Sequence, residues 1–374
     1  MITGAGASHD CWLRNASPPP AKEWRPPLSK DLFSPSVEFQ KILSRYPAGI
    51  HAGVEFLRRQ NKVSLEDFVS ELLGRGVKDV QYRRQAVEVT CYLQDLFVQV
   101  SKEYLPFSGR VANAYTWLTG EIYRHKEQFT RVCFVNPCYD VFLDLPLGGL
   151  LGVTFDQIEK YIALPERWLY IKPHGSANWM RRIIAEGPGP YMERLCATAD
   201  VRLGLKEDVK VFGLPELEKM AEPVTARGWY PAMTAPTGGG YRFACPTGHV
   251  EALRHFLRSG PLVILTIGFS GRDDDLIAEI RGHAPKILKL LAVDPAPAAI
   301  NHVHAQISGQ GGLAPPWAEG LPVGFATFVA QFAAEFLESW QSFGAPEELP
   351  VFLSSEFEGL DGYRPFALVL SGQG

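Results

Sequence analysis

The chain has 374 residues, of which 46% are hydrophobic and 21% charged, with a formal net charge of -4. This composition predicts a globular protein with one large domain carrying insertions, or two fused domains, and excludes a largely disordered chain. With a weakly acidic charge, no apolar run of roughly 20 residues and no signal-peptide pattern, we expect a cytoplasmic protein with no membrane contact and no direct nucleic-acid binding.

The first third of the sequence predicts a short strand, a loop and a set of helices. Residues 1–3 precede the glycine-rich run Gly4-Ala-Gly6-Ala-Ser8, and prolines make residues 15–36 a loop. Residues 37–128 have helical apolar spacing and are expected to form an inserted helical subdomain. One helix is expected to begin with the run that starts at Ser64.

Four short apolar runs then predict buried strands, at residues 132–135, 168–171, 262–267 and 287–293. Residues 250–257 and 274–281 predict helices. Strands that alternate with helices predict an α/β fold of the Rossmann-like, doubly wound kind, with a mostly parallel sheet. Residues 183–245 allow no firm assignment. Residues 323–341 carry aromatic side chains at helical spacing, which indicates a core face or an oligomer face.

Polar residues follow several of these strands, where a parallel sheet binds its ligands. The Gly4–Ser8 run suits close approach to a pyrophosphate, although a tight strand–helix turn also needs glycine. His174 could act as a general base or could satisfy a loop hydrogen bond. Asp140 could hold a ribose hydroxyl or a carboxamide, or cap a helix.

The two later loops fit the same edge. Ser270 and the N–H groups after Gly268 could bind phosphate or ribose, and Asp294 ends a further strand, where an acid commonly meets a ribose. The aspartates at 273–275 could bind a metal, but we expect them to cap and start a helix.

These segments together resemble the sirtuin-like family of NAD-consuming proteins, particularly its bacterial anti-phage-defence branch. The resemblance covers roughly residues 1–300, and its most specific part is the run from His174 to Trp179. It rests on residues 4–8, 138–140, 174–179, 267–270 with Arg272 and Asp274, and a Pro-Thr loop at 230–237.

The resemblance implies NAD as substrate, no metal, and a domain over residues 1–310. The helical insert covers about residues 37–128, and residues 311–374 form a C-terminal helix and tail for oligomer or partner contacts. It implies catalytic roles for His174, Asn136 and Asp140, and NAD contacts from Gly4, Ala5, Gly6, Ser8, Gly175, Gly268, Ser270 and Asp294.

One position departs from the family pattern. Relatives carry an asparagine two residues before the aspartate, where this chain has Cys138. Two alternatives stay open: a local bulge presents Asn136 to the site instead, or the site is inactive.

Three functions follow from the resemblance. The first is an NAD glycohydrolase that depletes NAD during phage infection, as a homo-oligomer and with a HerA-type ATPase or an Argonaute protein as partner. The second is a non-catalytic scaffold or sensor subunit that binds NAD or ADP-ribose. The third, a protein deacylase, is disfavoured because the six cysteines include no C-x-x-C pair, whereas a four-cysteine zinc module needs close pairs.

Overall fold

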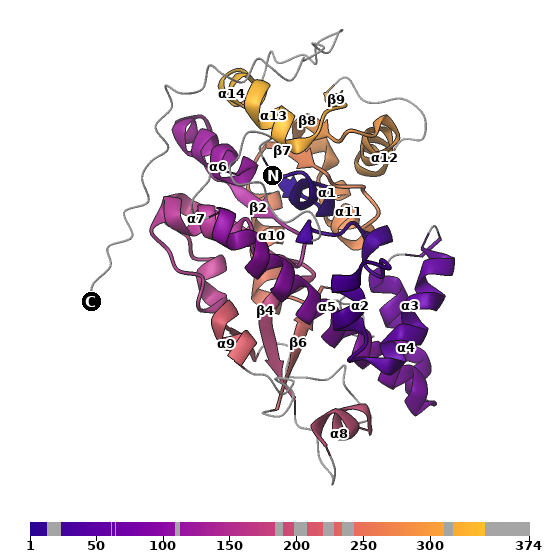
Figure 1. Cartoon of the computed structure of the whole chain (residues 1–374). Helices are drawn as coiled ribbons and strands as arrows, with labels where there is room; N and C mark the ends of the chain where they lie inside the picture. The colour runs from indigo at the N-terminus through magenta and orange to yellow at the C-terminus, as the bar shows by residue number, and fades with distance from the viewer. Residues whose placement is uncertain are drawn as a thin grey trace, which may run out of the picture.

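The computed structural model contains two sheets with helices packed around them (Figure 1). It describes residues 1–12, 24–60, 62–63, 65–108, 113–183, 190–197, 208–219, 228–233, 243–309 and 317–340. The larger sheet has six strands, all parallel: β1 (Ile2–Thr3), β2 (Cys133–Val135), β3 (Leu169–Ile171), β7 (Leu262–Ile267), β8 (Ile287–Val293) and β9 (Ala318–Leu321).

The order of these strands is β3-β2-β1-β7-β8-β9. The chain starts at the centre, adds β2 and β3 on one side of β1, and then returns to add β7, β8 and β9 on the other. This is the Rossmann order, and its switch point lies between β1 and β7, where the chain changes direction. The predicted α/β class with a doubly wound, Rossmann-like sheet is therefore confirmed.

The smaller sheet lies in the connection between β3 and β7 and has antiparallel strands in the order β5-β4-β6. Its strands are β4 (Gly175–Arg182), β5 (Val209–Val211) and β6 (Trp229–Met233). The sequence did not predict this sheet. Pro231 sits in β6, which pairs with β4 alone, so a residue without an N–H is tolerated there.

The helices occupy all five connections of the main sheet, and the last two helices follow β9. They are α1 (Ala5–His9), α2 (Val37–Leu43), α3 (Pro47–Arg59), α4 (Leu65–Gly76), α5 (Val80–Ser108), α6 (Ala114–Arg124), α7 (Asp144–Leu151), α8 (Tyr191–Ala197), α9 (Leu214–Lys219), α10 (Thr247–Arg258), α11 (Asp274–Arg281), α12 (Pro297–Ser308), α13 (Phe325–Gln331) and α14 (Ala333–Glu338). Within the described ranges, no helix has both the length and the apolarity needed to cross a bilayer.

The helical insert occupies the connection from β1 to β2. Helices α3 and α4 pack on the long helix α5, which also contacts β4 and β6 of the smaller sheet. Rings of Phe33, Phe56, Phe68 and Tyr92 stack in this part of the core. These residues belong to the same hydrophobic cluster as the residues of the main sheet, and α5 packs the insert onto the smaller sheet.

The two faces of the main sheet are covered by different helices. Cys133 and Val135 of β2 line a small apolar space with residues of α10 and α11, such as Leu253 and Leu276. Phe134, which alternates with them, packs on Trp168, and Trp168 packs on Tyr123 of α6. The alternation of side chains along a strand thus places α10 and α11 on one face and α6 on the other.

Several predicted boundaries agree with the structure because local signals set them. Strands β7 and β8 and helix α11 occupy the predicted residues, and Asp273 caps α11 by accepting a hydrogen bond from Leu276 N at 3.0 Å. Ser36 and Asn113 cap α2 and α6 in the same way. Ser64, the expected start of α4, lies outside the described residues, as do prolines 18–20 and the tail after residue 340.

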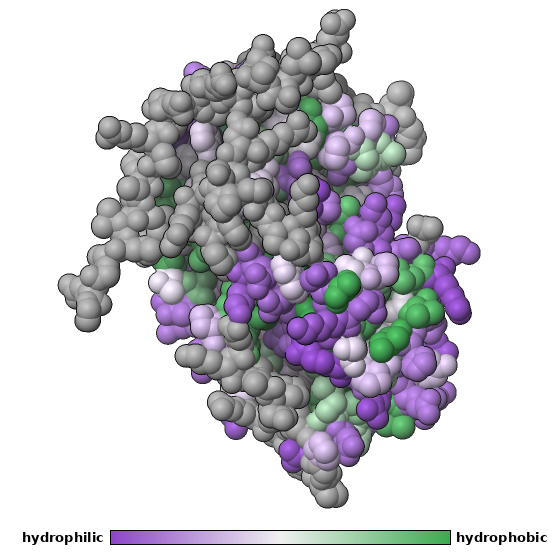
Figure 2. Space-filling view, in the orientation of Figure 1, coloured by the Kyte–Doolittle hydropathy of each residue, from purple (hydrophilic) through white to green (hydrophobic). Residues whose placement is uncertain are grey.

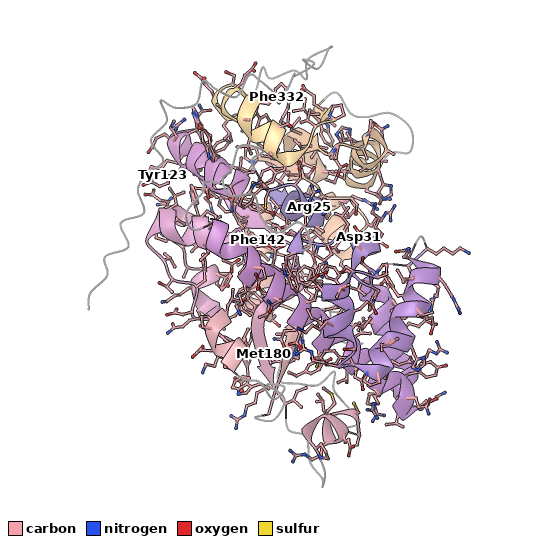
Figure 3. The ribbon with its side chains drawn as sticks, in the orientation of Figure 1. Arg25, Asp31, Tyr123, Phe142, Met180 and Phe332 are labelled. Carbon is pink, nitrogen blue, oxygen red and sulfur yellow. The ribbon has the colours of Figure 1, made fainter. Side chains whose placement is uncertain are left out.

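The aromatic run at residues 323–341 forms two short helices, α13 and α14, and not one helix. Their aromatic and aliphatic side chains are buried against α6 of the same chain, with Phe325 edge-on to Tyr115 at 4.9 Å between ring centroids. Figure 3 shows Phe332 within this group. Of the two interpretations of this run, a core face or an oligomer face, the structure supports the core face. The run therefore no longer supports the expected oligomer.

Some large apolar side chains remain exposed on the helical insert. Ile50 and Val54 lie one turn apart on α3, and Val77 and Val80 flank the turn between α4 and α5. Figure 2 shows hydrophobic atoms of this region scattered among hydrophilic ones. Single exposed apolar residues of this kind are ordinary for a protein surface.

Candidate functional site

The predicted polar loops lie together at the carboxyl edge of the main sheet. Because all six strands are parallel, the loops that follow them emerge on one side. The loop after β1 begins at Gly4, and β2 is followed by Asn136 to Asp140. The loop after β3 carries His174, β7 is followed by Gly268 to Asp273, and β8 by Asp294. The predicted arrangement of these loops on one edge is therefore confirmed.

Close backbone packing joins the two glycine loops at the switch point. Gly4 N donates to Ile267 O at 2.9 Å and Gly6 N to Gly268 O at 3.1 Å. A Cβ atom on Gly4 would lie 2.3 Å from Gly268 O. Gly268 has a φ of +56°, and a Cβ there would lie 2.2 Å from Ala7 N. All three glycines are therefore required by the contact between the loops.

Only Gly4 of the predicted glycine-rich loop precedes the five-residue helix α1, and Ala5 and Ser8 lie within this helix. Ala5 is partly exposed, whereas the Ser8 hydroxyl is fully buried and lies 2.9 Å from the hydroxyl of Tyr115 on α6. Burial, with the nearby charge of Asp140, raises the pKa of Tyr115 well above its usual value. Tyr115 is therefore a neutral hydrogen-bonding group between α6 and the loop.

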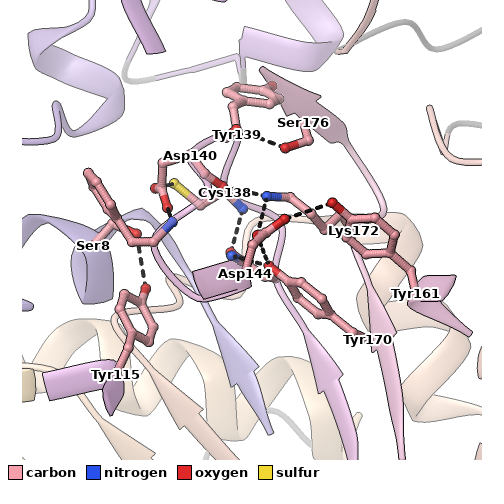
Figure 4. A network of polar contacts seen from close by, with 12 residues as sticks. Ser8, Tyr115, Cys138, Tyr139, Asp140, Asp144, Tyr161, Tyr170, Lys172 and Ser176 are labelled. Atoms are coloured by element: carbon pink, nitrogen blue, oxygen red, sulfur yellow. Dashed lines mark hydrogen bonds and ion pairs between the residues drawn. The ribbon is translucent and has the colours of Figure 1, made fainter. Parts of the chain in front are cut away.

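Asn136, Cys138 and Asp140 form a tight turn in the loop after β2 (Figure 4). Asn136 Oδ1 accepts a hydrogen bond from Cys138 N at 2.9 Å, and Asn136 Nδ2 donates to the hydroxyl of Tyr170 at 3.3 Å. The Cys138 thiol donates to Asp140 Oδ2 at 2.6 Å, and Asp140 Oδ1 accepts from Phe142 N at 3.1 Å. Thus Asn136 shapes the turn, and Cys138 is the side chain that contacts Asp140.

The thiol of Cys138 is in its neutral form. Burial, reinforced by the negative charge of Asp140, raises its pKa well above the usual value. A neutral thiol is a weak nucleophile, but it can donate a hydrogen bond to a carboxylate. Cys138 therefore orients Asp140.

A buried polar network beneath this turn was not predicted. Lys172 is fully buried, donates to the backbone carbonyl of Asp140 and pairs with Asp144 Oδ1 at 3.3 Å. Tyr161 and Tyr170 donate to the two oxygens of Asp144, at 2.7 and 2.8 Å (Figure 4). The network joins the ends of β2 and β3 and fixes the position of the Asp140 loop. A charged residue directly after a buried strand, here Lys172 after β3, was the available sequence signal.

His174 forms a contact with Asp273 that links the two halves of the sheet. Its Nε2 lies 2.7 Å from Oδ2 of Asp273, and both side chains are largely buried. His174 follows β3 and Asp273 follows β7, while β2 and β1 lie between those strands. The contact therefore joins loops from opposite halves of the sheet, across the carboxyl ends of β2 and β1.

The charge on Asp273 is stabilised by this contact. Burial alone would raise its pKa, but the charge and hydrogen bond of His174 and the backbone N–H of Leu276 outweigh burial, so the pKa is lowered. Asp273 is thus a carboxylate at neutral pH, and the Nε2 atom facing it carries the proton. The expected role of Asp273 in helix capping is confirmed, but its pairing with His174 was not predicted.

The remaining predicted site residues have different surroundings. Gly175 has a φ of +79°, and a Cβ there would lie 1.7 Å from Ala232 O, so β6 packing requires this glycine. Ser270 is exposed. Asp294 Oδ1 accepts from Ala296 N at 2.8 Å, and burial raises the pKa of Asp294 despite that bond. The expected loop over residues 230–237 begins as strand β6, and residues 234–237 lie outside the described part.

The structure also bears on metal binding. All six cysteines are free and buried. Among the residues that the structure describes, no group of three or more His, Cys, Asp or Glu side chains is placed to hold a metal ion.

No known protein family matches the chain, and no curated protein matches it.

Proposed function

We propose that this protein binds NAD and hydrolyses the bond between nicotinamide and ribose, releasing nicotinamide and ADP-ribose. The observation that carries the proposal is the His174–Asp273 pair, held over the switch point of a sheet with the Rossmann strand order. Doubly wound sheets bind nucleotides at this point. A histidine oriented by a buried carboxylate is the arrangement by which enzymes set up a general base.

The chemistry assigns the proton to His174. Cleavage passes through an oxocarbenium-like ribosyl cation. As the bond from C1′ to nicotinamide breaks, its electron pair goes to the pyridine nitrogen and nicotinamide leaves neutral. The oxygen of water forms the new bond to C1′, and its proton passes to His174. Asp273 stabilises the resulting imidazolium by its charge, since it already pairs with Nε2 at 2.7 Å.

Asp140 is assigned to the ribose hydroxyls or the carboxamide of nicotinamide. Each of its carboxylate oxygens accepts one hydrogen bond, from Cys138 and from Phe142 N. A carboxylate oxygen can accept a second bond, so Asp140 retains acceptor capacity. In this proposal Asn136 acts through the turn, as a positioning residue, because both ends of its amide are engaged.

The glycine loops are assigned to the diphosphate and adenosine. Gly4, Ala5, Gly6 and Ser8 would line the diphosphate, with the glycines permitting close approach of the ligand. The N–H groups of Gly4 and Gly6 already donate to Ile267 O and Gly268 O, and the Ser8 hydroxyl pairs with Tyr115. Gly175, Gly268, Ser270 and Asp294 would complete the NAD contacts. The hydroxyl of Thr3, at the end of β1, is fully buried without a hydrogen-bond partner, and a polar ligand at the switch point would satisfy it.

A second candidate function is a non-catalytic scaffold that binds NAD or ADP-ribose. The observation that favours it is the Cys138 thiol, which is neutral and buried where the family pattern has an asparagine. A thiol hydrogen-bonds weakly compared with an amide, so orientation of water at this position would be poorer.

The deciding experiment is nicotinamide release by the purified full chain, followed by chromatography. It is run alone and with a HerA-type ATPase or an Argonaute protein, the partners that the resemblance implies. We expect His174→Ala to abolish release while NAD binding, measured by calorimetry, persists. The matched control is His51→Ala, which alters an exposed histidine on α3.

The outcomes separate the candidates. Binding of NAD or ADP-ribose by the wild-type chain, without nicotinamide release under any condition, would establish the scaffold. Absence of any NAD binding would rule out both. The role in NAD depletion during anti-phage defence rests on the resemblance and stays a prediction. The homo-oligomer, which was expected from the aromatic run and the helical insert, also stays a prediction.

A further inference from the structure

A buried arginine lies in the smaller sheet, and two of its guanidinium nitrogens have no hydrogen-bond partner within the described part of the chain. Arg181 is on β4, is 1% exposed, and faces Tyr230 of β6 and Val209 of β5 in the sheet register. Its Nε and Nη2 atoms are buried without hydrogen-bond partners. Figure 3 marks the preceding residue, Met180, near the end of the molecule opposite Phe332.

The two unpartnered atoms form one edge of the guanidinium group. Arg254 uses the same edge to hold both carboxylate oxygens of Glu279, with Nε 3.0 Å from each oxygen. Planar N–H pairs of this kind match two oxygens of a carboxylate or a phosphoryl group. Arg181 therefore presents a complete recognition edge for an oxyanion.

The described part of the chain supplies no carboxylate to this edge, because Arg181 forms no ion pair there. The acidic residues of α5 are engaged elsewhere. Glu88 pairs with Arg84 and accepts hydrogen bonds from Ala48 N and Gly49 N, and Asp95 binds Tyr46. Burial lowers the pKa of Arg181, and the neighbouring Tyr230 opposes that shift only in part.

An unpaired buried charge is strongly unfavourable, and proteins retain one only where a counter-charge binds. We propose that Arg181 is the centre of a second binding site, which takes a small oxyanion in bidentate fashion on its Nε–Nη2 edge. Strand β4 begins at Gly175, directly after His174, and Arg181 lies six residues further along it. The site is thus separate from the switch point and goes beyond the proposed NAD chemistry.

The test compares thermal unfolding of the full chain in chloride, inorganic phosphate and succinate at matched ionic strength, with calorimetric titration of each anion. Phosphate or succinate should raise the melting temperature by about 2 to 4 °C at a concentration about a hundredfold above Kd. The anion that does so identifies the ligand as phosphoryl or carboxylate. His174→Ala should keep this response, so the result is independent of the proposed NAD chemistry.

The variants isolate the guanidinium. Arg181→Met should lose the anion response and melt in chloride no lower than the wild type, because it removes an unpaired charge. Arg181→Lys keeps a charge without the planar edge and should lose most of the response. Arg182→Met, at the adjacent exposed arginine, is the control and should respond normally.

The proposal fails if neither anion changes the wild-type melting temperature or gives binding heat, or if Arg181→Met keeps the response. If Arg181→Met does not fold, wild-type calorimetry and Arg181→Lys decide: a wild-type response that Arg181→Lys retains in full overturns the bidentate site.

Discussion

Replacement of Asp273 by asparagine tests the assignment of His174 as a base. In the wild type the Asp273 carboxylate accepts a hydrogen bond from Nε2–H of His174, so the lone pair of the neutral imidazole is on Nδ1. Asp273 Oδ1 also caps α11 at Leu276 N. In Asp273→Asn the amide oxygen can keep the cap, and the amide NH2 then faces Nε2. Nε2 must become the acceptor, so the proton moves to Nδ1 and the base is lost.

The magnitude follows from this change of tautomer. A positioned general base contributes about 10²- to 10⁴-fold in rate, and loss of a histidine-orienting aspartate in catalytic triads costs about 10⁴-fold. Each factor of ten corresponds to about 1.4 kcal/mol, so the activation free energy should rise by about 3 to 5 kcal/mol. NAD affinity should change little because the side chains of this pair are not among the assigned contacts to the diphosphate and adenosine.

Acid unfolding provides a second readout for the same variant. The pKa of Asp273 is lowered in the folded state, below its ordinary value of about 3.9. Its ionised form therefore stabilises the protein above that value, and this contribution is lost as the pH falls through the folded-state pKa. The wild type should exceed Asp273→Asn in stability near neutral pH, and the difference should shrink below about pH 4.

The assay is nicotinamide release at saturating NAD, with circular dichroism as the check on folding. Because the two residues act as a unit, Asp273→Asn combined with His174→Ala should be no slower than His174→Ala alone. The reasoning is refuted if Asp273→Asn retains wild-type turnover while His174→Ala is inactive.

Two further predictions concern the loops beside this pair. Gly268→Ala should lower the free energy of unfolding by at least about 2 kcal/mol in urea titrations, because a Cβ at this position collides with Ala7 N. The control is Gly152→Ala, whose φ is +65° but whose Cβ would lie in open space, so its loss of stability should be smaller. Equal losses in the two variants would contradict the collision argument. Asn136→Ala should slow nicotinamide release nearly as much as His174→Ala, because Asn136 holds the turn that places Asp140. Cys138→Ala should slow release less. An inactive Cys138→Ala variant together with an active Asn136→Ala variant would show that these roles are reversed.

The boundaries of several strands and helices could be predicted from the sequence. Apolar runs with turn residues on both sides defined β7 and β8, and the aspartates at 273–275 marked the start of α11. These features depend on residues within a few positions of one another. The sequence could predict the doubly wound fold class but not the strand order, because alternating strands and helices are compatible with several orders.

The smaller sheet was missed because β4 has no alternating pattern. Its residues from Gly175 to Arg181 are all buried, and they mix small, polar, aromatic and charged side chains. Burial on both faces removes the period of two that marks a strand. The sequence could not show whether the aromatic run at 325–337 packs in the core or on another copy of the chain. The helix that covers this run, α6, lies some 200 residues earlier in the chain.

The candidate site was predicted as a set of loops but not as a set of contacts. His174 and Asp273 are 99 residues apart, and their pairing requires two loops to reach across the ends of β1 and β2. Lys172 and Asp144 are similarly linked only through the meeting of two strand ends. The spacing of apolar residues indicates which side of each segment is buried, but it does not indicate which loops contact each other.

The choice between hydrolase and scaffold depends on what the buried groups are arranged to do. A scaffold needs the glycine loops and the adenosine contacts, and it has no use for a histidine held by a carboxylate. The His174–Asp273 pair confines two loops and buries two titratable groups, a cost that simple binding would not require. The Cys138 thiol donates a hydrogen bond to Asp140 and so keeps that carboxylate oriented. In the proposed function His174 is the base and Asp140 is the oriented carboxylate, so nicotinamide release by the wild-type chain is the result that separates the hydrolase from the scaffold.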